Sequence, residues 1–343
     1  MRCILHIGTE KTATTSIQAF LRRNETRLRR QRVAVGYGSE YTNNFDFFAY
    51  FFEGTNHHYF WNHGISNQRE KDLYFRYFVP FFDSAVRSAR EQGAESIIIS
   101  SEHLHGRLRK ISELDRLAEF LLSRFAEVDV LAYFREQSSL LKSLYSEAIK
   151  FGGDVSYIEF RDKKLKDHYF LDYNESCSLW SKVFGKPYVN ARIFERRHFF
   201  KNDIRLDVLN FVDPRIDTTA VKVPDTAANS SLNRLQVAVG REVNRRYPRY
   251  RATAEQKQLR AALWRKIVSD RALKAPPIDE PDPEAIYEMF DARNRNFGRM
   301  FCATAGNPFR PPRPASNSAD NEGVDADEVA HIVSKMLADL GAV

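Results

Sequence analysis

The amino-acid sequence predicts an α/β fold, with a three-layer, doubly wound and mainly parallel sheet followed by a helical C-terminal part. Short apolar runs alternate with segments of helical period up to about residue 218. The run at 95–100 is rich in isoleucine, as expected for a strand buried on both faces of a parallel sheet. Beyond about residue 218 the strand signal fades and helical patterns remain.

The predicted elements alternate along the chain. The run from Cys3 to Ile7 predicts a strand, which leads through a polar loop into a helix at 16–31. A short strand at 33–36 precedes an aromatic-rich segment, which ends in a long helix over 68–92 with Pro80 as its expected break. The remaining core elements are strands at 95–100, 128–134 and 189–194 and helices at 112–126, 136–150 and 203–211.

Three regions follow from this order. Residues 1–218 are expected to form the α/β core, in which the aromatic-rich segment 41–92 is mostly core and partly a candidate substrate-side surface. Residues 219–303 are expected to form a helical subdomain or cap. Residues 304–343 read as a proline-rich linker and an amphipathic helix. That helix packs either on its own core or on a second copy, so a homo-oligomer is an open alternative.

The composition is typical of a soluble globular protein in a reducing compartment. Three widely spaced cysteines, Cys3, Cys177 and Cys302, form neither a disulfide framework nor a zinc-binding pattern. No run of about 18 apolar residues occurs, so no membrane segment is expected, and the chain opens directly on its first predicted strand. These observations favour a cytoplasmic location.

The net charge of +7 comes largely from clustered arginines. Such clusters attract polyanions, and an anionic nucleotide or an acidic glycan would suit them. Each cluster taken alone is more often a solvated helix face. Charge is the only feature that points to nucleic acid, and no nucleic-acid-binding motif accompanies it, so nucleic acid is not an expected partner.

The loop after the first strand is the best candidate for binding an anion. Backbone N–H groups and the dipole at a helix N-terminus attract phosphate, and Thr14, Thr15 and Ser16 add hydroxyl donors. A Walker A loop needs a Gly-Lys pair, whereas Lys11 lies three residues after Gly8 with no glycine directly before it. The sequence therefore argues against a nucleoside triphosphate and magnesium, and leaves an atypical P-loop kinase as a minor alternative.

This loop resembles the 5′-phosphosulfate-binding loop of bacterial sulfotransferases, which have a P-loop-like fold and use 3′-phosphoadenosine 5′-phosphosulfate (PAPS). The family pattern Lys-x-Gly-Thr-Thr-Ser/Ala matches the run Lys11-Thr12-Ala13-Thr14-Thr15-Ser16 except at Ala13. The departure matters if this position has a positive φ or if a ligand approaches its backbone closely. The resemblance implies that these six residues bind the cofactor.

A second family signature is an arginine at a strand end followed eight positions later by a serine on the next helix. Arg135 ends the run at 128–134, and Ser143 lies eight residues further on. A guanidinium fork and a helix hydroxyl together suit a 3′-phosphate, which ordinary adenine nucleotides lack. The resemblance therefore implies that Arg135 and Ser143 also bind PAPS.

The resemblance implies a sulfotransferase that moves a sulfuryl group from PAPS to a hydroxyl or amine of a carbohydrate or other small acceptor by in-line displacement. Lys11 would contact the 5′-phosphate and the bridging oxygen and stabilise charge on the leaving group, 3′-phosphoadenosine 5′-phosphate. A non-catalytic nucleotide-binding protein with the same fold is the alternative, which Ala13 and the undetermined base keep open.

The base that removes the acceptor proton is sought at the end of the 95–100 strand. Glu102 is the first choice because it follows the carboxyl end of a predicted central strand, and His103 and His105 come next. A neutral histidine suits proton abstraction near pH 7, whereas a glutamate needs burial or a charged neighbour. The other candidates lie in the aromatic-rich segment: His57, His58 and His63. No partner at metal-ligand spacing accompanies His103 and His105, so no metal is expected.

Overall fold

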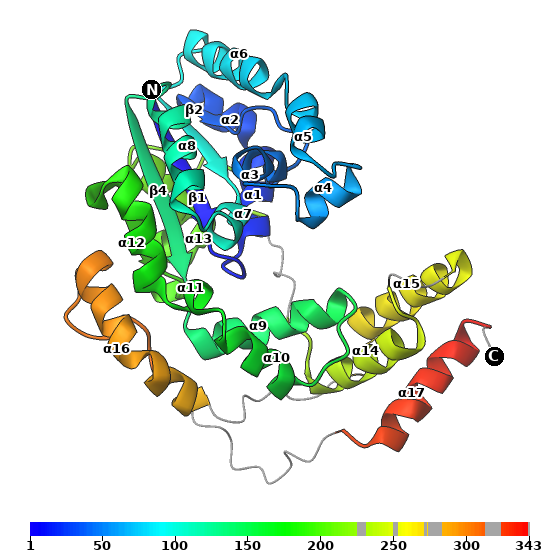
Figure 1. Cartoon of the computed structure of the whole chain (residues 1–343). Helices are drawn as coiled ribbons and strands as arrows, with labels where there is room; N and C mark the ends of the chain where they lie inside the picture. Colours follow the sequence, from blue (N-terminus) through cyan, green and yellow to red (C-terminus); the bar gives the residue numbers. More distant parts are fainter. Residues whose placement is uncertain (225–230, 250–252, 271–272, 274–282, 313–323, 342–343) are drawn as a thin grey trace. The chain divides into compact units, whose positions relative to one another are not determined.

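The computed structural model describes residues 1–224, 231–249, 253–270, 273, 283–312 and 324–341, and the chain divides into two compact units (Figure 1). Unit 1 comprises Met1–Arg135, Asp172–Ala228 and Arg293–Phe309. Unit 2 comprises Glu136–Leu171, Asn229–Ala292 and Arg310–Val343. Each unit is therefore assembled from three separate stretches of the chain.

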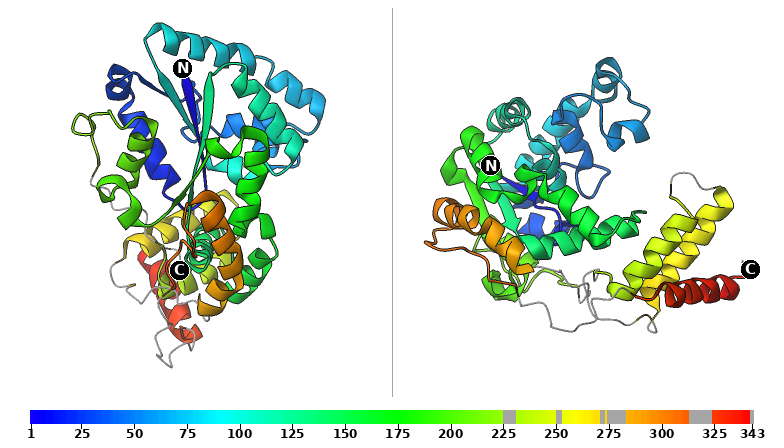
Figure 2. Two further views of the ribbon diagram at one scale, coloured as in Figure 1. Left: turned by 90° about the vertical axis from the view of Figure 1, so that its left-hand side faces the viewer. Right: turned by 60° about the horizontal axis from the view of Figure 1, so that its bottom comes forward.

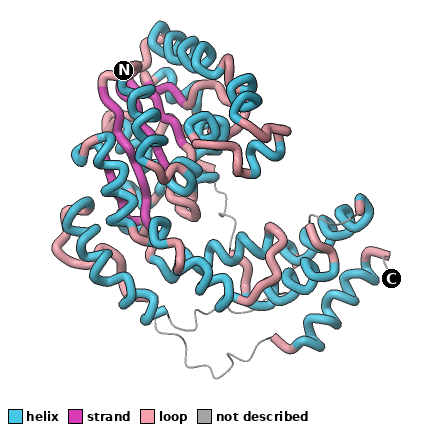
Figure 3. Tube along the Cα trace, viewed as in Figure 1, coloured by secondary structure: helices cyan, strands magenta, loops and turns pink. Residues whose placement is uncertain are grey.

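Unit 1 is built around one parallel sheet. Its described strands, drawn in magenta in Figure 3, run in the order β2-β3-β1-β4-β5, and every neighbouring pair is parallel. Their bounds are β1 (Arg2–Gly8), β2 (Val33–Val35), β3 (Ser96–Ser100), β4 (Glu127–Phe134) and β5 (Val189–Ile193). β3 is buried along its whole length, which explains its unbroken apolar sequence. The predicted α/β class with a parallel sheet is confirmed.

Helices cover both faces of this sheet (Figure 2). One face carries Tyr133, whose hydroxyl donates to Asp207 at 2.6 Å, and the opposite face carries Phe134, whose ring packs on Tyr173. Because successive residues of a strand point to opposite faces, the helices of these two partners lie on different sides. The face that carries Tyr133 is covered by α13 (Ile204–Val212), α1 (Thr14–Arg23) and α2 (Glu25–Arg30). The face that carries Phe134 is covered by α12 (Tyr173–Phe184) and α8 (Ile111–Leu122).

The aromatic-rich segment folds into four helices, α3 (Phe45–Phe51), α4 (His58–Asn62), α5 (Gln68–Tyr74) and α6 (Phe78–Glu91). About half of its rings are core, among them the fully buried Phe47, Phe48, Phe60 and Phe82, whereas others such as Trp61 are exposed. The helix predicted over 68–92 breaks before Pro80, which instead lies in the first turn of α6, where a missing N–H leaves no helical hydrogen bond unmade.

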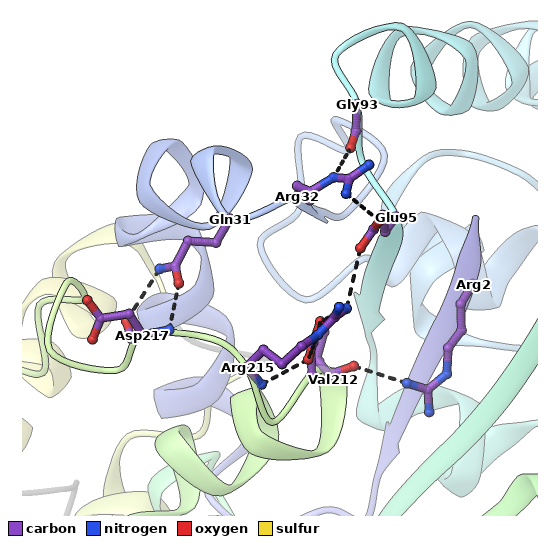
Figure 4. Close-up of polar contacts among 9 residues, drawn as sticks. Arg2, Gln31, Arg32, Gly93, Glu95, Val212, Arg215 and Asp217 are labelled. Carbon is purple, nitrogen blue, oxygen red and sulfur yellow. Dashed lines mark hydrogen bonds and ion pairs between the residues drawn. The ribbon is translucent and has the colours of Figure 1, made fainter.

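The amino edge of the sheet is tied together by charged side chains (Figure 4). Arg2 pairs with Asp129 of β4 and donates to the Val212 carbonyl, at the end of α13, at 3.0 Å. Arg32 and Arg215 both pair with Glu95, directly before β3. These contacts join three strands to the end of one covering helix.

Unit 2 is helical in its described part. Its helices are α9 (Gln137–Lys150), α10 (Tyr157–Leu165), α11 (His168–Leu171), α14 (Arg234–Arg246), α15 (Ala254–Ser269), α17 (Ala326–Asp339) and the first half of α16 (Pro283–Phe301). An apolar cluster from α14, α15 and α17 includes Val243, Ile267 and Val333. None of the described helices is long and apolar enough to cross a lipid bilayer.

This division differs from the expected regions 1–218, 219–303 and 304–343. The helix after β4, α9, packs on α14: the Leu232 N–H donates to Ser146 at 2.8 Å, and Asn244 donates to the Ile149 carbonyl at 2.8 Å. Contacts between segments about 90 residues apart therefore assign α9 to the helical unit. The proline-rich linker and the acidic stretch after it lie partly outside the described residues, at 313–323.

Candidate functional site

The loop after β1 has an unusual backbone. Gly8, Lys11 and Ala13 have φ values of +106°, +65° and +62°. A Cβ on Gly8 would lie 3.1 Å from both Cα and Cβ of Glu102, so glycine is required for the close approach of β1 and the end of β3. Ala13 directly precedes α1 in the left-handed conformation, which costs a residue other than glycine about 1–2 kcal/mol. Glycine, which the sulfotransferase pattern has at the position of Ala13, would adopt this conformation without strain.

Two threonine hydroxyls hold the loop itself together. Thr9 donates its N–H and its hydroxyl to the Tyr133 carbonyl of β4, at 3.0 and 3.1 Å. Thr12 is fully buried and donates its hydroxyl to the Thr9 carbonyl at 2.7 Å. No side chain caps the first turn of α1, whose N–H groups on Thr14, Thr15 and Ser16 lack intrahelical acceptors. The loop is therefore fixed to β4 through Thr9, and the first turn of α1 has backbone N–H groups that can donate to a ligand.

Arg135 follows β4 and lies beside this loop. Its guanidinium is 3.5 Å from the Lys11 carbonyl and 5.8 Å from the centre of the Phe194 ring. The structure thus brings together the arginine of the second signature and the lysine of the first. Ser143 is buried in α9 of unit 2, so its joint role with Arg135 stays a prediction.

Glu102 begins α7 (Glu102–Arg107), directly after β3, and its side chain is 15% exposed. Gln18 of α1 donates its amide to Glu102 Oε2 at 2.7 Å and also reaches the Ser100 carbonyl at 3.4 Å. The carboxylate is therefore oriented from the helix that follows the loop. Gln18 was not identified from the sequence, because a buried amide on a helix belongs to no motif.

An aromatic cluster next to Glu102 contains His57, His58, His103 and Phe45, and is termed the histidine cluster. The His103 ring stacks on Phe45 at 4.1 Å, and the His57 and His58 ring centres are 4.0 Å apart. His103 Nε2 lies 3.1 Å from the Asn43 amide, and its Nδ1 has no hydrogen-bond partner in the described part of the chain. A buried polar atom thus lies inside an aromatic surround.

The pKa values of these three histidines are lowered. Burial, with a contribution from Arg107, lowers the pKa of His103 to about 3, and burial, with His58 and Arg107, lowers the pKa of His57 to about 4. Burial and Arg107 also lower the pKa of His58. All three are therefore neutral near pH 7. Arg107 in turn forms an ion pair with Glu10 of the loop at 3.0 Å.

The two other predicted histidines have different surroundings. His105 is fully buried, with its ring edge-on to Phe134. His63 is hydrogen bonded at 2.7 Å to the Tyr41 hydroxyl and at 2.7 Å to the Tyr59 carbonyl. No group of three His, Cys, Asp or Glu residues that could hold a metal ion occurs among the residues described.

Comparisons with known proteins leave the family unassigned. No known family profile matches the chain. An uncharacterised protein of Archaeoglobus fulgidus is 30% identical over 148 residues, which are 43% of this chain and 38% of that protein, so the chain spans well under half of its relative. The crystal structure of a sulfotransferase from Alicyclobacillus acidocaldarius aligns with 66% of this chain and 85% of its own at 16% identity, with a TM-score of 0.40. A functional proposal therefore rests on the residues of the site.

Proposed function

We propose that this protein binds PAPS and transfers its sulfuryl group to a hydroxyl or amine of a carbohydrate or other small acceptor. The observation that carries the proposal is the position of Arg135. Two motifs 124 residues apart match the PAPS-binding signatures, and Arg135 of the second lies against Lys11 of the first. Neighbours brought together by folding are stronger support than either motif in the linear sequence.

The residues at the carboxyl edge of the sheet suit such a nucleotide. The first turn of α1 offers backbone donors and the positive end of a helix dipole to a 5′-phosphate. Lys11 and Arg135 add two cations on adjacent strand ends, and Glu10 is neutralised by Arg107. PAPS, when bound, supplies a sulfuryl group attached to a good leaving group.

Each predicted site residue then has a proposed role. Lys11 stabilises charge on the leaving phosphate, residues 12–16 hold that phosphate through their amides and the hydroxyls of Thr14, Thr15 and Ser16, and Arg135 with Ser143 binds the 3′-phosphate. The Thr12 hydroxyl serves the loop through its bond to the Thr9 carbonyl.

Glu102 is the proposed general base. Its Cα and Cβ lie close to Gly8 of the loop, and its carboxylate is partly exposed and oriented by Gln18, so we assign it to accept the proton of the acceptor. His103, with its pKa lowered to about 3, is a weak base at neutral pH, and we assign it to a hydrogen bond with the acceptor. His105 ranks behind both because it is fully buried. The rings of the histidine cluster give the acceptor a surface to stack on.

The nucleotide part of the proposal is tested by thermal melting. Saturating 3′-phosphoadenosine 5′-phosphate should raise the melting temperature, because a ligand that binds the folded state stabilises it by about 2.7 kcal/mol at one hundred times its Kd. Arg135→Ala should abolish the shift, whereas Arg23→Ala, which removes an exposed arginine of α1, should keep it. Stabilisation by ATP with Mg²⁺ but not by the bisphosphate would refute the proposal.

The transfer step is tested separately with PAPS labelled in its sulfuryl group and an acceptor panel of sugars, amines and phenols. The parent protein should label at least one acceptor, and Lys11→Met should lower the rate about 100-fold or more, as removal of a charge-stabilising group does. Tight nucleotide binding without transfer to any acceptor would instead favour the non-catalytic alternative, to which the strained Ala13 would then be the structural clue.

A further inference from the structure

A cleft of about 610 Å³ lies in unit 1 among α3, α5, α6 and α8 and is termed the α5–α8 cleft. Its volume is typical of sites that take small organic ligands. One end is lined by Ser123 and Arg124, close to Ala126, whose N–H donates to the Met1 carbonyl at 3.3 Å. That end therefore lies towards the amino edge of the sheet, whereas the PAPS-type loop follows the opposite end of β1.

The lining of this cleft is cationic. Lys71, Arg76, Arg116 and Arg124 line it, against the carboxylates of Asp72 and Glu119. Arg124 pairs with Asp83 at 2.6 Å, outside the lining. The other three cations donate to backbone carbonyls instead, those of Phe52, Leu73 and Phe51. A carbonyl positions a cation without neutralising its charge, so Lys71, Arg76 and Arg116 keep their positive charges in the lining.

Lys71 and Arg116 repel each other within this lining. Lys71 is 4% exposed, and burial followed by the charge of Arg116 lowers the pKa of its ammonium to about 8. Asp72, Glu113 and Glu53 act in the opposite direction but do not offset these two effects. An anion bound between Lys71 and Arg116 would relieve the repulsion that the fold imposes on them.

Flat aromatic rings lie beside these cations. Tyr50 stacks on Phe78 with ring centres 4.1 Å apart, and Phe51 meets Phe120 at 5.3 Å. The Arg124 guanidinium lies 3.9 Å above the Phe120 ring. Rings and guanidinium groups of this kind favour a planar ligand, which stacks on both.

We propose that the α5–α8 cleft is a binding site for a small organic anion: a flat, ring-bearing molecule with a sulfonate, sulfate, phosphate or carboxylate group. The anionic group lies at Lys71 and Arg116, and the ring packs on Tyr50 and Phe120. This site is separate from the proposed PAPS site and does not depend on transferase activity.

The test is a fluorescence titration of the full chain with 8-anilinonaphthalene-1-sulfonate, an aromatic sulfonate. Arg116→Gln and Lys71→Gln should each weaken binding about tenfold, the loss expected for one charge-assisted contact. Arg87→Gln removes an equal charge from an exposed position on α6 outside the lining and should leave the Kd unchanged. Uncharged N-phenyl-1-naphthylamine should bind at least tenfold more weakly than the sulfonate.

Each contrary result overturns the proposal. Equal effects of Arg116→Gln and Arg87→Gln would show that only net charge matters, and equal binding of the uncharged analogue would show that the cleft is merely apolar. Displacement of the probe by 3′-phosphoadenosine 5′-phosphate would place it in the other site. Each variant is first melted without ligand, and a melting curve that matches the parent confirms that it is folded. Because Arg116→Gln and Lys71→Gln are tested separately, either folded variant is enough to test the proposal.

Discussion

The two edges of the parallel sheet are built on opposite physical plans. At the amino edge, Arg32 and Arg215 pair with Glu95 (Figure 4), and Arg2 pairs with Asp129. At the carboxyl edge, left-handed backbone at Lys11 and Ala13 lies near neutral, buried histidines. The amino edge is thus arranged for electrostatic neutrality, with one left-handed residue at Arg32, whereas the carboxyl edge combines two left-handed residues with suppressed charge. In parallel α/β folds ligands bind at the carboxyl edge, where such costs serve recognition.

The largest expected effect is on chemistry at the carboxyl edge. Glu102→Gln removes the proposed base but keeps a side chain of the same size beside Gln18, so we expect transfer to fall 10²–10⁴-fold with nucleotide affinity unchanged. His103→Gln should chiefly raise KM for the acceptor. The measurements are initial rates with labelled PAPS and bisphosphate titrations. A larger fall in kcat for His103→Gln than for Glu102→Gln would reverse the assigned roles.

Lowering the pH should reduce the free energy of unfolding through groups at the carboxyl edge before it does so through groups at the amino edge. Burial lowers the pKa of His6 to about 4, so between about pH 6.5 and 4 the unfolded state binds a proton that the folded state does not, and stability falls as pH falls. For His6 the loss is about 2 kcal/mol at pH 5, and His57 and His103 act in the same direction. At the amino edge, hydrogen bonding to Arg215 lowers the pKa of Asp213, so its stabilisation is lost only below the ordinary value of 3.8.

Urea unfolding from pH 7 to 4.5 measures this dependence. His6→Asn should reduce the loss, since the amide does not titrate and retains a group that can hydrogen bond with Ser100, the present partner of His6 at 2.8 Å. His331→Asn, at an exposed position on α17, is the control and should follow the parent. A parent protein with constant stability over this range would show that the carboxyl-edge histidines are not held neutral.

Strain at the loop is expected to have a smaller effect. Ala13→Gly should stabilise the protein by about 0.5–1 kcal/mol, because relief of the left-handed alanine outweighs the extra entropy of glycine in the unfolded chain. Ala19→Gly, at an exposed position inside α1, should destabilise it by about 1 kcal/mol. Opposite signs for two identical substitutions six positions apart are the diagnostic result in urea unfolding. The same sign for both would contradict the assigned conformation of Ala13.

The smallest effect is expected at the amino edge. Arg215 has a side chain that is 79% exposed, and exposed ion pairs are weak and screened by salt. Arg215→Ala should leave the melting temperature within about 2 °C of the parent, and high salt should remove even that difference. Differential scanning calorimetry at two salt concentrations provides the measurement. A large decrease in melting temperature that persists at high salt would contradict the expectation that this ion pair contributes little to stability.

The sequence predicts the parts of the structure that are encoded locally. The isoleucine-rich run predicted a buried strand, and two short motifs identified Lys11 and Arg135, which the fold indeed brings together. The conformation of Ala13 was anticipated only conditionally, as a glycine position with positive φ. Such motifs can be recognised in the sequence because their residues are close together in the chain or lie at the ends of predicted strands.

Features that depend on distant contacts could not be predicted. The helix expected over 16–31 is instead interrupted at Asn24, between α1 and α2, and the Asn24 side chain donates to the Lys222 carbonyl, 198 residues away, at 3.0 Å. Gln18 bonds Glu102 across 84 residues, and Asn43 meets His103 across 60. No local pattern records such partners. For the same reason α9 was assigned to the sheet domain, although α14 holds it in unit 2.

The alternation of the two units along the chain has a consequence for biosynthesis. Six stretches alternate between the units, and the last stretch of unit 1 supplies Phe297 and Phe309, whose rings pack on Phe134 and Tyr173 at 5.0 and 5.7 Å. A nascent chain that has emerged only as far as residue 218 therefore still exposes the side of β4 that these rings cover. The sheet unit therefore cannot complete these contacts before residues 293–309 have left the ribosome, so a stop codon within α16 would remove them from the sheet unit.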